Sequence, residues 1–281
     1  MSGKKGSKEL FVSKAVDDFY NHTSEEERLT IGLGPLEFER NRMLIGKYLF
    51  NSTHNIVDVG GGTGKYSEWL ANMGKEVWLV DPVQKHVLQA QKRSEKLSNR
   101  FHTMRGEARH LDFPDSFADM VIMHGPLYHL QEKSERLKAI NEAKRITKPG
   151  GIILGFAINY TASTIVGLLQ GVIHEEGIFE MCRSELATGE HNAPANMPGI
   201  LAEAYYHRPG ELKTEFEESG LGNIEMHAVE GIIWLDKNFF SSRADKKKND
   251  HLLEIIRLTE KDADLISFSP HMMIAGRKQI G

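Results

Sequence analysis

The chain has 281 residues and a formal charge of −4 at pH 7, from 35 Lys and Arg against 39 Asp and Glu. This length allows one large domain, or one domain with an added cap. The charge balance disfavours a nucleic-acid substrate, because binding a phosphate backbone needs a basic face. The single cysteine, Cys182, excludes an intramolecular disulfide and favours a reducing compartment.

Two segments bear on targeting. Residues 1–8 are polar and lysine-rich and lack the apolar core of a signal peptide. The most apolar window, residues 151–173, is interrupted by polar residues and reads as a strand followed by a helix rather than a membrane span. We therefore expect a cytoplasmic protein with no membrane and no nucleic-acid partner.

The N-terminal part of the chain has apolar residues at the spacing of an α-helix. Apolar residues recur with that spacing from residue 12 to Tyr20, and Pro35 is placed to open a second helix after Gly32-Leu33-Gly34. These sequence patterns predict two helices before the first strand.

A glycine-rich loop follows the first buried strand. The short apolar run Ile56–Val59 leads into Gly60, Gly61, Gly62 and Gly64, and helical spacing resumes at Tyr66. A strand, a tight loop and a helix N-terminus form the geometry that binds a ligand at the carboxyl end of a parallel strand.

The spacing of this loop distinguishes three kinds of site. A phosphate-binding P-loop fails, because Val59 stands at its first glycine and Tyr66 at its Ser or Thr. A dinucleotide fingerprint fails for lack of its third glycine. The pattern acidic-x-Gly-x-Gly-x-Gly fits, with Asp58 as the acidic residue, and here the chain resembles the class I S-adenosylmethionine (SAM)-dependent methyltransferases. The resemblance spans residues 55–156 and includes Arg-x-x-Lys-Pro-Gly-Gly at 145–151, before an apolar strand.

The resemblance implies an α/β fold. We expect a Rossmann-like, seven-stranded, mostly parallel sheet of order 3-2-1-4-5-7-6, with strand seven antiparallel, N-terminal helices and an inserted cap. Strands are expected at 56–59, 76–81, 101–105, 117–124, 152–158, within 224–235, and at 271–275. The expected division is a helical lid (1–50), a SAM-binding core (51–158), a cap (159–208, with a loop at 191–198) and the C-terminal part of the sheet (209–281).

A second aspartate supports the cofactor site. Asp81 lies 23 positions beyond Asp58, close to the offset of about 20 at which an acidic residue meets a ribose in such folds. The resemblance further implies adenine contacts at Glu107 and Ala108, where the family more often has Asp at the first position. It also implies that carbonyls at His124 and Gly125 accept from the SAM ammonium, and that the lid contributes Tyr20 and Arg40. The expected cofactor-binding set is Asp58, Gly60, Gly61, Gly62, Gly64, Asp81, Pro82, Glu107, Ala108, His124, Gly125, Tyr20 and Arg40.

Methyl transfer from SAM requires positioning and desolvation more than covalent catalysis. Tyr128 and His129 follow strand four, where the methyl group should lie, and His129 and His207 are candidate general bases because imidazole titrates near neutral pH. We expect no catalytic metal, because neither His-Glu-x-x-His nor Cys-x-x-Cys occurs.

The residues after strand four also indicate the acceptor class. Base-modifying members of the family carry Asn/Asp-Pro-Pro-aromatic there or a Pro-Cys pair, whereas this chain has His124-Gly125-Pro126-Leu127 and no Pro-Cys. We therefore expect a methyltransferase that acts on a small molecule by in-line displacement, as a monomer or homodimer. Two alternatives remain: a SAM-binding sensor or pseudoenzyme without turnover, and an NAD-dependent oxidoreductase, which the missing third glycine disfavours.

Overall fold

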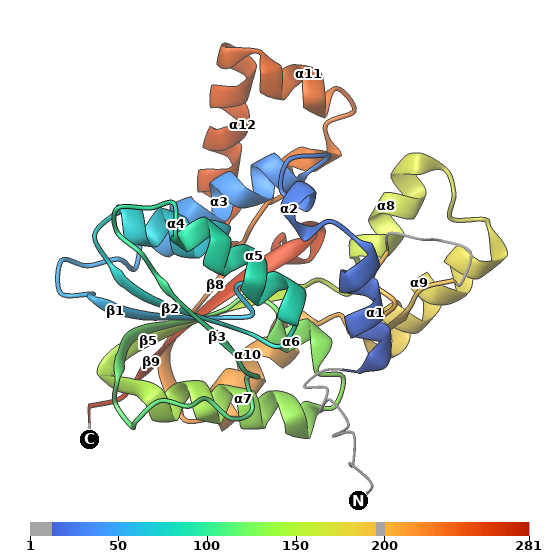
Figure 1. Ribbon diagram of the computed structural model, residues 1–281. Helices are drawn as coiled ribbons and strands as arrows, with labels where there is room; N and C mark the ends of the chain where they lie inside the picture. Colours follow the sequence, from blue (N-terminus) through green and yellow to red (C-terminus); the bar gives the residue numbers. More distant parts are fainter. Residues whose placement is uncertain (1–12, 195–199, 281) are drawn as a thin grey trace, which may run out of the picture.

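A seven-stranded sheet organises the chain in a computed structural model that describes residues 13–194 and 200–280 (Figure 1). Its strand order is β3-β2-β1-β4-β5-β9-β8, with β9 antiparallel to both of its neighbours and the other pairs parallel. The strands are β1 (Asn55–Val59), β2 (Glu76–Asp81), β3 (His102–Arg105), β4 (Ala118–Met123), β5 (Thr147–Ile158), β8 (Leu221–Ala228) and β9 (His271–Lys278). The expected order and antiparallel strand are confirmed.

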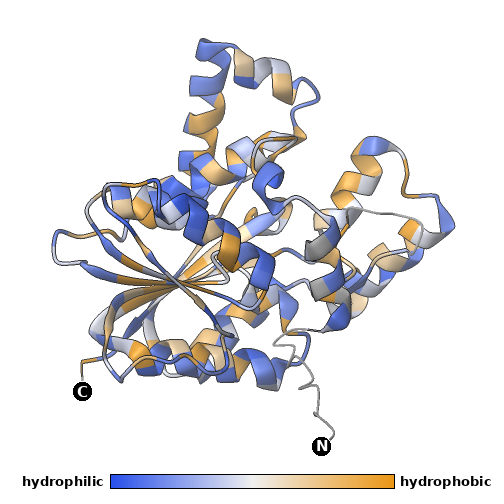
Figure 2. Ribbon diagram, in the orientation of Figure 1, coloured by the Kyte–Doolittle hydropathy of each residue, from blue (hydrophilic) through white to orange (hydrophobic). Residues whose placement is uncertain are grey.

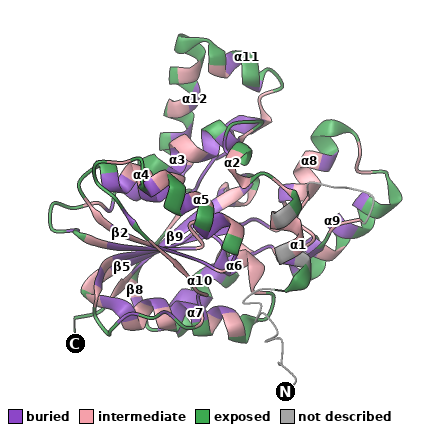
Figure 3. Ribbon diagram, viewed as in Figure 1, coloured by how far each residue is buried: buried purple, intermediate pink, exposed green. Residues whose placement is uncertain are grey.

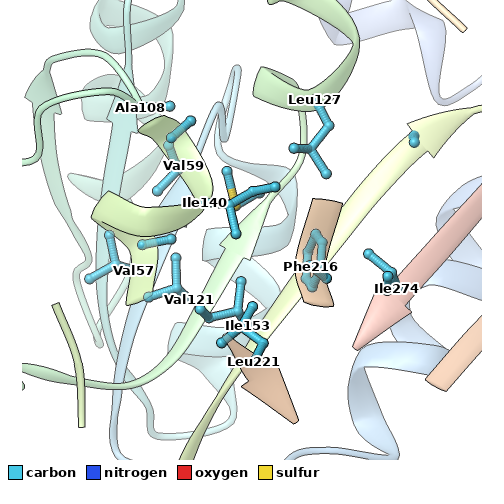
Figure 4. Close-up of a cluster of buried hydrophobic side chains, with 14 of the residues drawn as sticks. Val57, Val59, Ala108, Val121, Leu127, Ile140, Ile153, Phe216, Leu221 and Ile274 are labelled. Carbon is cyan, nitrogen blue, oxygen red and sulfur yellow. The ribbon is translucent and has the colours of Figure 1, made fainter. Parts of the chain in front are cut away.

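The central strands are buried on both faces, so successive side chains enter two different cores. Val57 and Val59 of β1 point into one core, together with Phe216 (Figure 4), while Ile56 points into the other. Figure 3 shows this burial as a continuous buried centre of the sheet. Near-continuous apolar runs are therefore what these strands require, and this is why they could be located from the sequence.

Helices cover both faces of the sheet (Figure 1). One core includes residues of α6 (Pro126–His129), α7 (Lys133–Ile146) and α10 (Pro209–Glu218). The other includes residues of α3 (Gly34–Gly46), α4 (Lys65–Asn72) and α5 (Gln84–Ser94). The result is a three-layer α/β/α arrangement with the carboxyl ends of the parallel strands along one edge.

Three further groups of elements lie outside these layers. At the N-terminal side are α1 (Lys14–His22) and α2 (Glu25–Arg28). Between β5 and α10 lie α8 (Ala162–Gln170), α9 (Glu176–Thr188) and a hairpin of β6 (Glu190–Asn192) and β7 (Glu203–Tyr205). Between β8 and β9 lie η1 (Ile233–Leu235), α11 (Phe239–Ala244), α12 (Lys246–Thr259) and η2 (Ile266–Phe268). In Figure 2, α12 shows apolar residues among polar ones as it projects beyond α3.

Some local expectations differ from the structure. The segment expected as a loop at 191–198 begins inside β6, because His191 pairs with Ala204 of β7; residues 195–199 lie outside the described part, as do residues 1–12. The strand expected at 152–158 begins earlier, at Thr147, with a register shift against β4 and a φ of +76° at Gly150. The strand expected within 224–235 also begins earlier, at Leu221. Within the described ranges, no helix combines the length and apolarity needed to cross a membrane.

Candidate active site

A cavity of about 840 Å³ runs along the edge where the parallel strands end. Because β9 is antiparallel, its first residue also lies at this edge. From one side of the sheet to the other, the wall of the cavity includes Glu107 after β3, Asp81 at β2, Gly60 after β1, His124 after β4, Ile158 at β5 and His271 at β9. Residues of α1, α2, α8 and α9 also line it, so segments far apart in sequence enclose one space.

Glycines form the floor of the cavity after β1. At Gly60, φ is +75°, and a Cβ there would lie 3.0 Å from the backbone N of Gly125. A Cβ at Gly61 would lie 2.8 Å from Oδ2 of Asp58. The positive φ at Gly60 and the close contacts that a Cβ would make at both positions require glycine. Bare backbone therefore faces the cavity at this point. Gly64 does not line the cavity; it is the N-cap residue of α4, and a Cβ there would meet the ring of Phe101 at 2.8 Å.

Asp81 ties the end of β2 to this loop. Its Oδ2 accepts from the backbone N–H of Gly62 at 2.9 Å, and its Oδ1 accepts from that of Val83 at 2.9 Å and lies 3.2 Å from Nδ1 of His86. A carboxylate offers about four acceptor positions, so capacity remains for a ligand hydroxyl. These contacts orient the carboxylate at the cavity wall.

Asp58 lies behind the cavity rather than on it. Its Oδ2 accepts from Oγ of Ser67 at 2.7 Å, and its Oδ1 lies 3.0 Å from Nδ1 of His124. The His124 ring is stacked between Tyr66 and Phe156, with ring centroids 4.3 and 4.5 Å away. We therefore correct the expectation for Asp58: it holds the helix and His124 in place instead of facing a ligand.

Tyr20, Tyr128 and His129 meet at the cavity, although Tyr20 is more than 100 residues from the other two. Oη of Tyr20 lies 2.8 Å from Nε2 of His129, and Oη of Tyr128 donates to the carbonyl of His124 at 2.8 Å. Burial lowers the pKa of His129 to about 4, so its ring is neutral at pH 7. The structure brings these three expected residues together.

Pro82, Glu107, Ala108 and Gly125, which are expected to contact the cofactor, also line the cavity. The Glu107 carboxylate, however, is engaged by Arg109, whose backbone N–H and Nε donate to Oε2 at 2.9 and 2.8 Å. Oε2 of Glu107 is therefore already engaged within the protein.

Two further expected site residues, besides Asp58 and Gly64, lie outside the cavity. Arg40 is buried on α3, where Nε donates to the carbonyl of Val229 at 2.9 Å and Nη2 donates to Glu260 at 2.6 Å. His207 is fully buried with Nε2 3.4 Å from Glu215, and burial lowers its pKa. Both side chains satisfy buried carboxylates, so the expectation that they face a ligand is corrected.

No sequence pattern indicates the charged cluster that lies at the β9 end of the cavity. Nη1 and Nη2 of Arg28 donate to the two oxygens of Glu37 at 2.7 and 3.1 Å, and Nδ1 of His271 lies 2.7 Å from Oε1 of Glu230. Burial alone would lower the pKa of His271, but Glu230 and Glu37 outweigh it and raise the pKa to about 9. These residues come from α2, α3, the segment after β8, and β9, so no local spacing could announce them.

Glu37, Glu230 and His271 offer ligand atoms that lie within 4.8 Å of one another. Arg28 already pairs with Glu37, and the protonated His271 pairs with Glu230. We therefore interpret the group as an ion-pair network and assign no metal to it.

Comparison with known proteins identifies the family. Residues 57–155 match a family model described as a methyltransferase domain. Over 204 residues the chain is 30% identical to the ubiquinone/menaquinone biosynthesis C-methyltransferase UbiE of Neisseria meningitidis, a match that covers 68% of this chain and 78% of that protein. The chain belongs to the class I SAM-dependent methyltransferases.

Solved structures agree with the fold of this methyltransferase. A SAM-dependent methyltransferase from Methanosarcina mazei superimposes with a TM-score of 0.58 at 17% identity, covering 85% of this chain and 98% of that one. Phosphoethanolamine N-methyltransferase 2 of Haemonchus contortus, in complex with SAM, gives a TM-score of 0.56 at 16% identity, covering 96% of this chain and 61% of that one.

The cofactor of this methyltransferase is SAM, and the residues present fit it. SAM carries an adenosyl group and an amino acid but no phosphate. The bare backbone at Gly60 and Gly61 admits close approach, and the carboxylate of Asp81 stands at the strand where a ribose is expected.

Proposed function

We propose that this methyltransferase transfers the methyl group of SAM to a small molecule with an apolar body, by direct in-line displacement. The observation that carries the proposal is the extent of the cavity. Ligand pockets typically measure about 300–1,000 Å³, and the 840 Å³ here continues past the glycine loop to β5 and β9. That volume suits SAM together with an acceptor.

In the proposed arrangement, SAM takes the part of the cavity over β3, β2 and β1. The ribose hydroxyls donate to Asp81, and the adenine lies beside Pro82 and Ala108. The amino-acid end rests on Gly60–Gly62 and reaches the carbonyls at His124 and Gly125. Tyr20 supports this placement, because its ring packs on His86, which contacts Asp81.

The acceptor then occupies the space over β5 and β9, beneath the proposed cap of residues 159–208. The residues that line this space are mainly apolar: Phe156, Ile158, Ala162, Val166, Ile178, Met181 and Leu201. Each Å² of apolar acceptor surface buried here contributes about 25 cal/mol of favourable free energy. The UbiE relative is named for ubiquinone and menaquinone biosynthesis, and an acceptor of low polarity is consistent with that name.

When bound, SAM supplies an electrophilic methyl carbon attached to a sulfonium. The contribution of the chain is to align the acceptor and exclude water, effects that can lower a barrier by about 7–11 kcal/mol. The aromatic rings of Tyr20 and Tyr128 are placed to favour the positive charge. His129, being neutral, can accept a proton if the acceptor must lose one.

Calorimetric titration followed by turnover tests the proposal. SAM and S-adenosylhomocysteine should bind, while NAD and ATP should give no heat. A panel of small apolar phenols, enols, amines and thiols is then incubated with SAM, and S-adenosylhomocysteine and the methylated product are followed by mass spectrometry. Tight NAD binding, or SAM binding without methylation of any small molecule, would contradict the proposed function.

A further inference from the structure

Helices α1 and α2 cover the part of the cavity where SAM is proposed to bind. Tyr20 of α1 and Glu25 of α2 line the cavity. A Cβ at Gly62 would lie 3.6 Å from Cγ of Glu25. The ring of Tyr20 packs on that of His86, which contacts Asp81, with 4.8 Å between ring centroids. The two helices therefore lie over both the glycine-rich loop and the carboxylate at the end of β2.

These two helices bury few apolar side chains. Among the described residues of α1 and α2, Val16 is the only buried apolar one. Helix α3 differs, because Leu44 and Ile45 belong to one core of the sheet. Segments with few buried apolar contacts open locally at a lower free energy than global unfolding requires. Helices α1 and α2 can therefore move while α3 and the sheet stay folded.

A lysine on α5 holds the end of α1. Nζ of Lys85 donates to the carbonyl oxygens of Tyr20 and Thr23, at 2.9 Å each. These carbonyls lie at the C-terminal end of α1, where backbone acceptors lack helical partners and a positive charge is favoured. Lys85 therefore both caps α1 and ties it to α5.

An arginine on α5 holds α2 in the same way. Nη2 of Arg93 donates to the carboxylate of Glu26 in α2, and Nε donates to the carbonyl of Thr63, in the glycine-rich loop, at 3.0 Å. Nη1 of Arg93 donates to Glu68 of α4, which fixes the guanidinium to the body of the protein. The described lining of the cavity includes neither Lys85, Arg93 nor Glu26, so these side chains act on a bound ligand only through the segments that they hold.

We propose that α1 and α2 form a lid that Lys85 and Arg93 hold closed over SAM, and that this lid lifts for the cofactor to enter and leave. The inference rests on the proposed function, because it concerns the cofactor half of the same cavity. Oη of Tyr20 lies 2.8 Å from Nε2 of His129 on α6. Since α5 follows β2 and α6 follows β4, the closed lid spans the loop after β1 that lies between them.

A clamp of this kind controls rates rather than affinity. A weaker clamp raises the open fraction of the free protein and, by the same factor, that of the complex. Association and dissociation of the cofactor then both become faster, while the dissociation constant, which is their ratio, changes little. A residue that only contacts the cofactor would instead change mainly the dissociation rate.

Surface plasmon resonance with S-adenosylhomocysteine on the immobilised full chain tests the proposal. Lys85→Met keeps the aliphatic stem but removes the charge, and Glu26→Gln removes the charge that Arg93 holds. Each should raise both the association and the dissociation rate about fivefold or more, with Kd within about threefold of the unmodified chain. Matched controls are Lys92→Met, at an exposed position of α5, and Glu217→Gln, at an exposed position of α10; both should leave the rates unchanged.

Hydrogen exchange in the same variants locates the motion. S-adenosylhomocysteine should slow exchange in residues 14–28, and both clamp variants should speed it there while β1 and β4 exchange as in the unmodified chain, which distinguishes lid opening from global unfolding. Unchanged rates in both variants, a faster dissociation without faster association, or exchange in residues 14–28 that S-adenosylhomocysteine does not slow would overturn the inference. A chain that does not bind S-adenosylhomocysteine at all would instead contradict the proposed function.

Discussion

The carboxylate of Asp81 accepts a hydrogen bond from the backbone N–H of Gly62, with 2.9 Å between Oδ2 and N. This bond joins the end of β2 to the loop after β1, the two places where the adenosyl group and the amino-acid end of SAM are proposed to lie. The bond therefore holds the two halves of the proposed cofactor site in register.

Replacing Asp81 with Asn should weaken SAM binding while the fold is retained. The amide cannot accept from both backbone N–H groups, and a charge-assisted bond to ribose is lost, which corresponds to about 1.5–3 kcal/mol or a roughly 10- to 100-fold rise in Kd. Titration calorimetry measures the change. Asp115→Asn, at a carboxylate that is 78% exposed, is the control and should bind SAM normally. An unchanged Kd in Asp81→Asn would remove Asp81 from the site.

A methyl group at Gly61 should destabilise the protein. Its Cβ would lie 2.8 Å from both Oδ2 of Asp58 and Cδ1 of Leu79, so buried groups must shift, at a cost of about 1–3 kcal/mol. Urea unfolding of Gly61→Ala gives the loss directly. At Gly210, in α10, a Cβ meets nothing within 4 Å, so Gly210→Ala should be neutral or stabilising by up to about 1 kcal/mol. Equal stability of the two variants would show that the loop relaxes.

The strands of the sheet could be predicted from the sequence because they are buried and therefore form apolar runs. The apolar run of β2 predicted its bounds, and the glycine spacing after β1 predicted the ligand loop. The sequence does not predict which face of each N-terminal helix lines the cavity. Arg40 and Glu37 both lie on α3, yet Glu37 lines the cavity and Arg40 pairs with Glu260. Helical spacing alone does not say which side packs on the core.

The charged end of the cavity was also hidden from the sequence. Arg28 and His271 are separated by more than 200 positions and meet only because β9 returns antiparallel along β5. Likewise, His207 is a candidate general base by its residue type, but its ring contacts Glu215 of α10. Such contacts depend on tertiary packing, which a motif of adjacent residues does not encode.

His207→Ala should lower stability and leave ligand binding alone. The substitution removes a buried partner of Glu215 and leaves a void, so we expect a loss of about 1–3 kcal/mol in unfolding free energy. Thermal or urea unfolding measures that loss, and calorimetry should find the SAM affinity within twofold of the unmodified chain. A stable variant with impaired SAM binding or turnover would return His207 to the site.

The titrations of His129 and His271 together should make the free energy of unfolding highest near pH 6.5. The pKa of His271 is raised to about 9, so its contribution is complete below pH 6.5 and is lost as the pH rises through 9. The pKa of His129 is lowered to about 4, so its contribution is present above pH 6.5 and is lost as the pH falls toward 4. Unfolding free energies measured between pH 4 and 10 should show both limbs.

Single variants assign the limbs. His271→Gln should flatten the alkaline limb and leave the acid one, and His129→Gln should do the reverse. If both variants kept the full pH dependence, the titrations would belong to other groups.

The structure of the chain crystallised with SAM tests the central claim most directly. We expect the ribose hydroxyls within hydrogen-bond distance of the Asp81 carboxylate, the amino-acid end on Gly60–Gly62, and the methyl group directed toward the space over β5 and β9. A ribose far from Asp81, or a methyl group facing closed protein with no adjoining cavity, would contradict it.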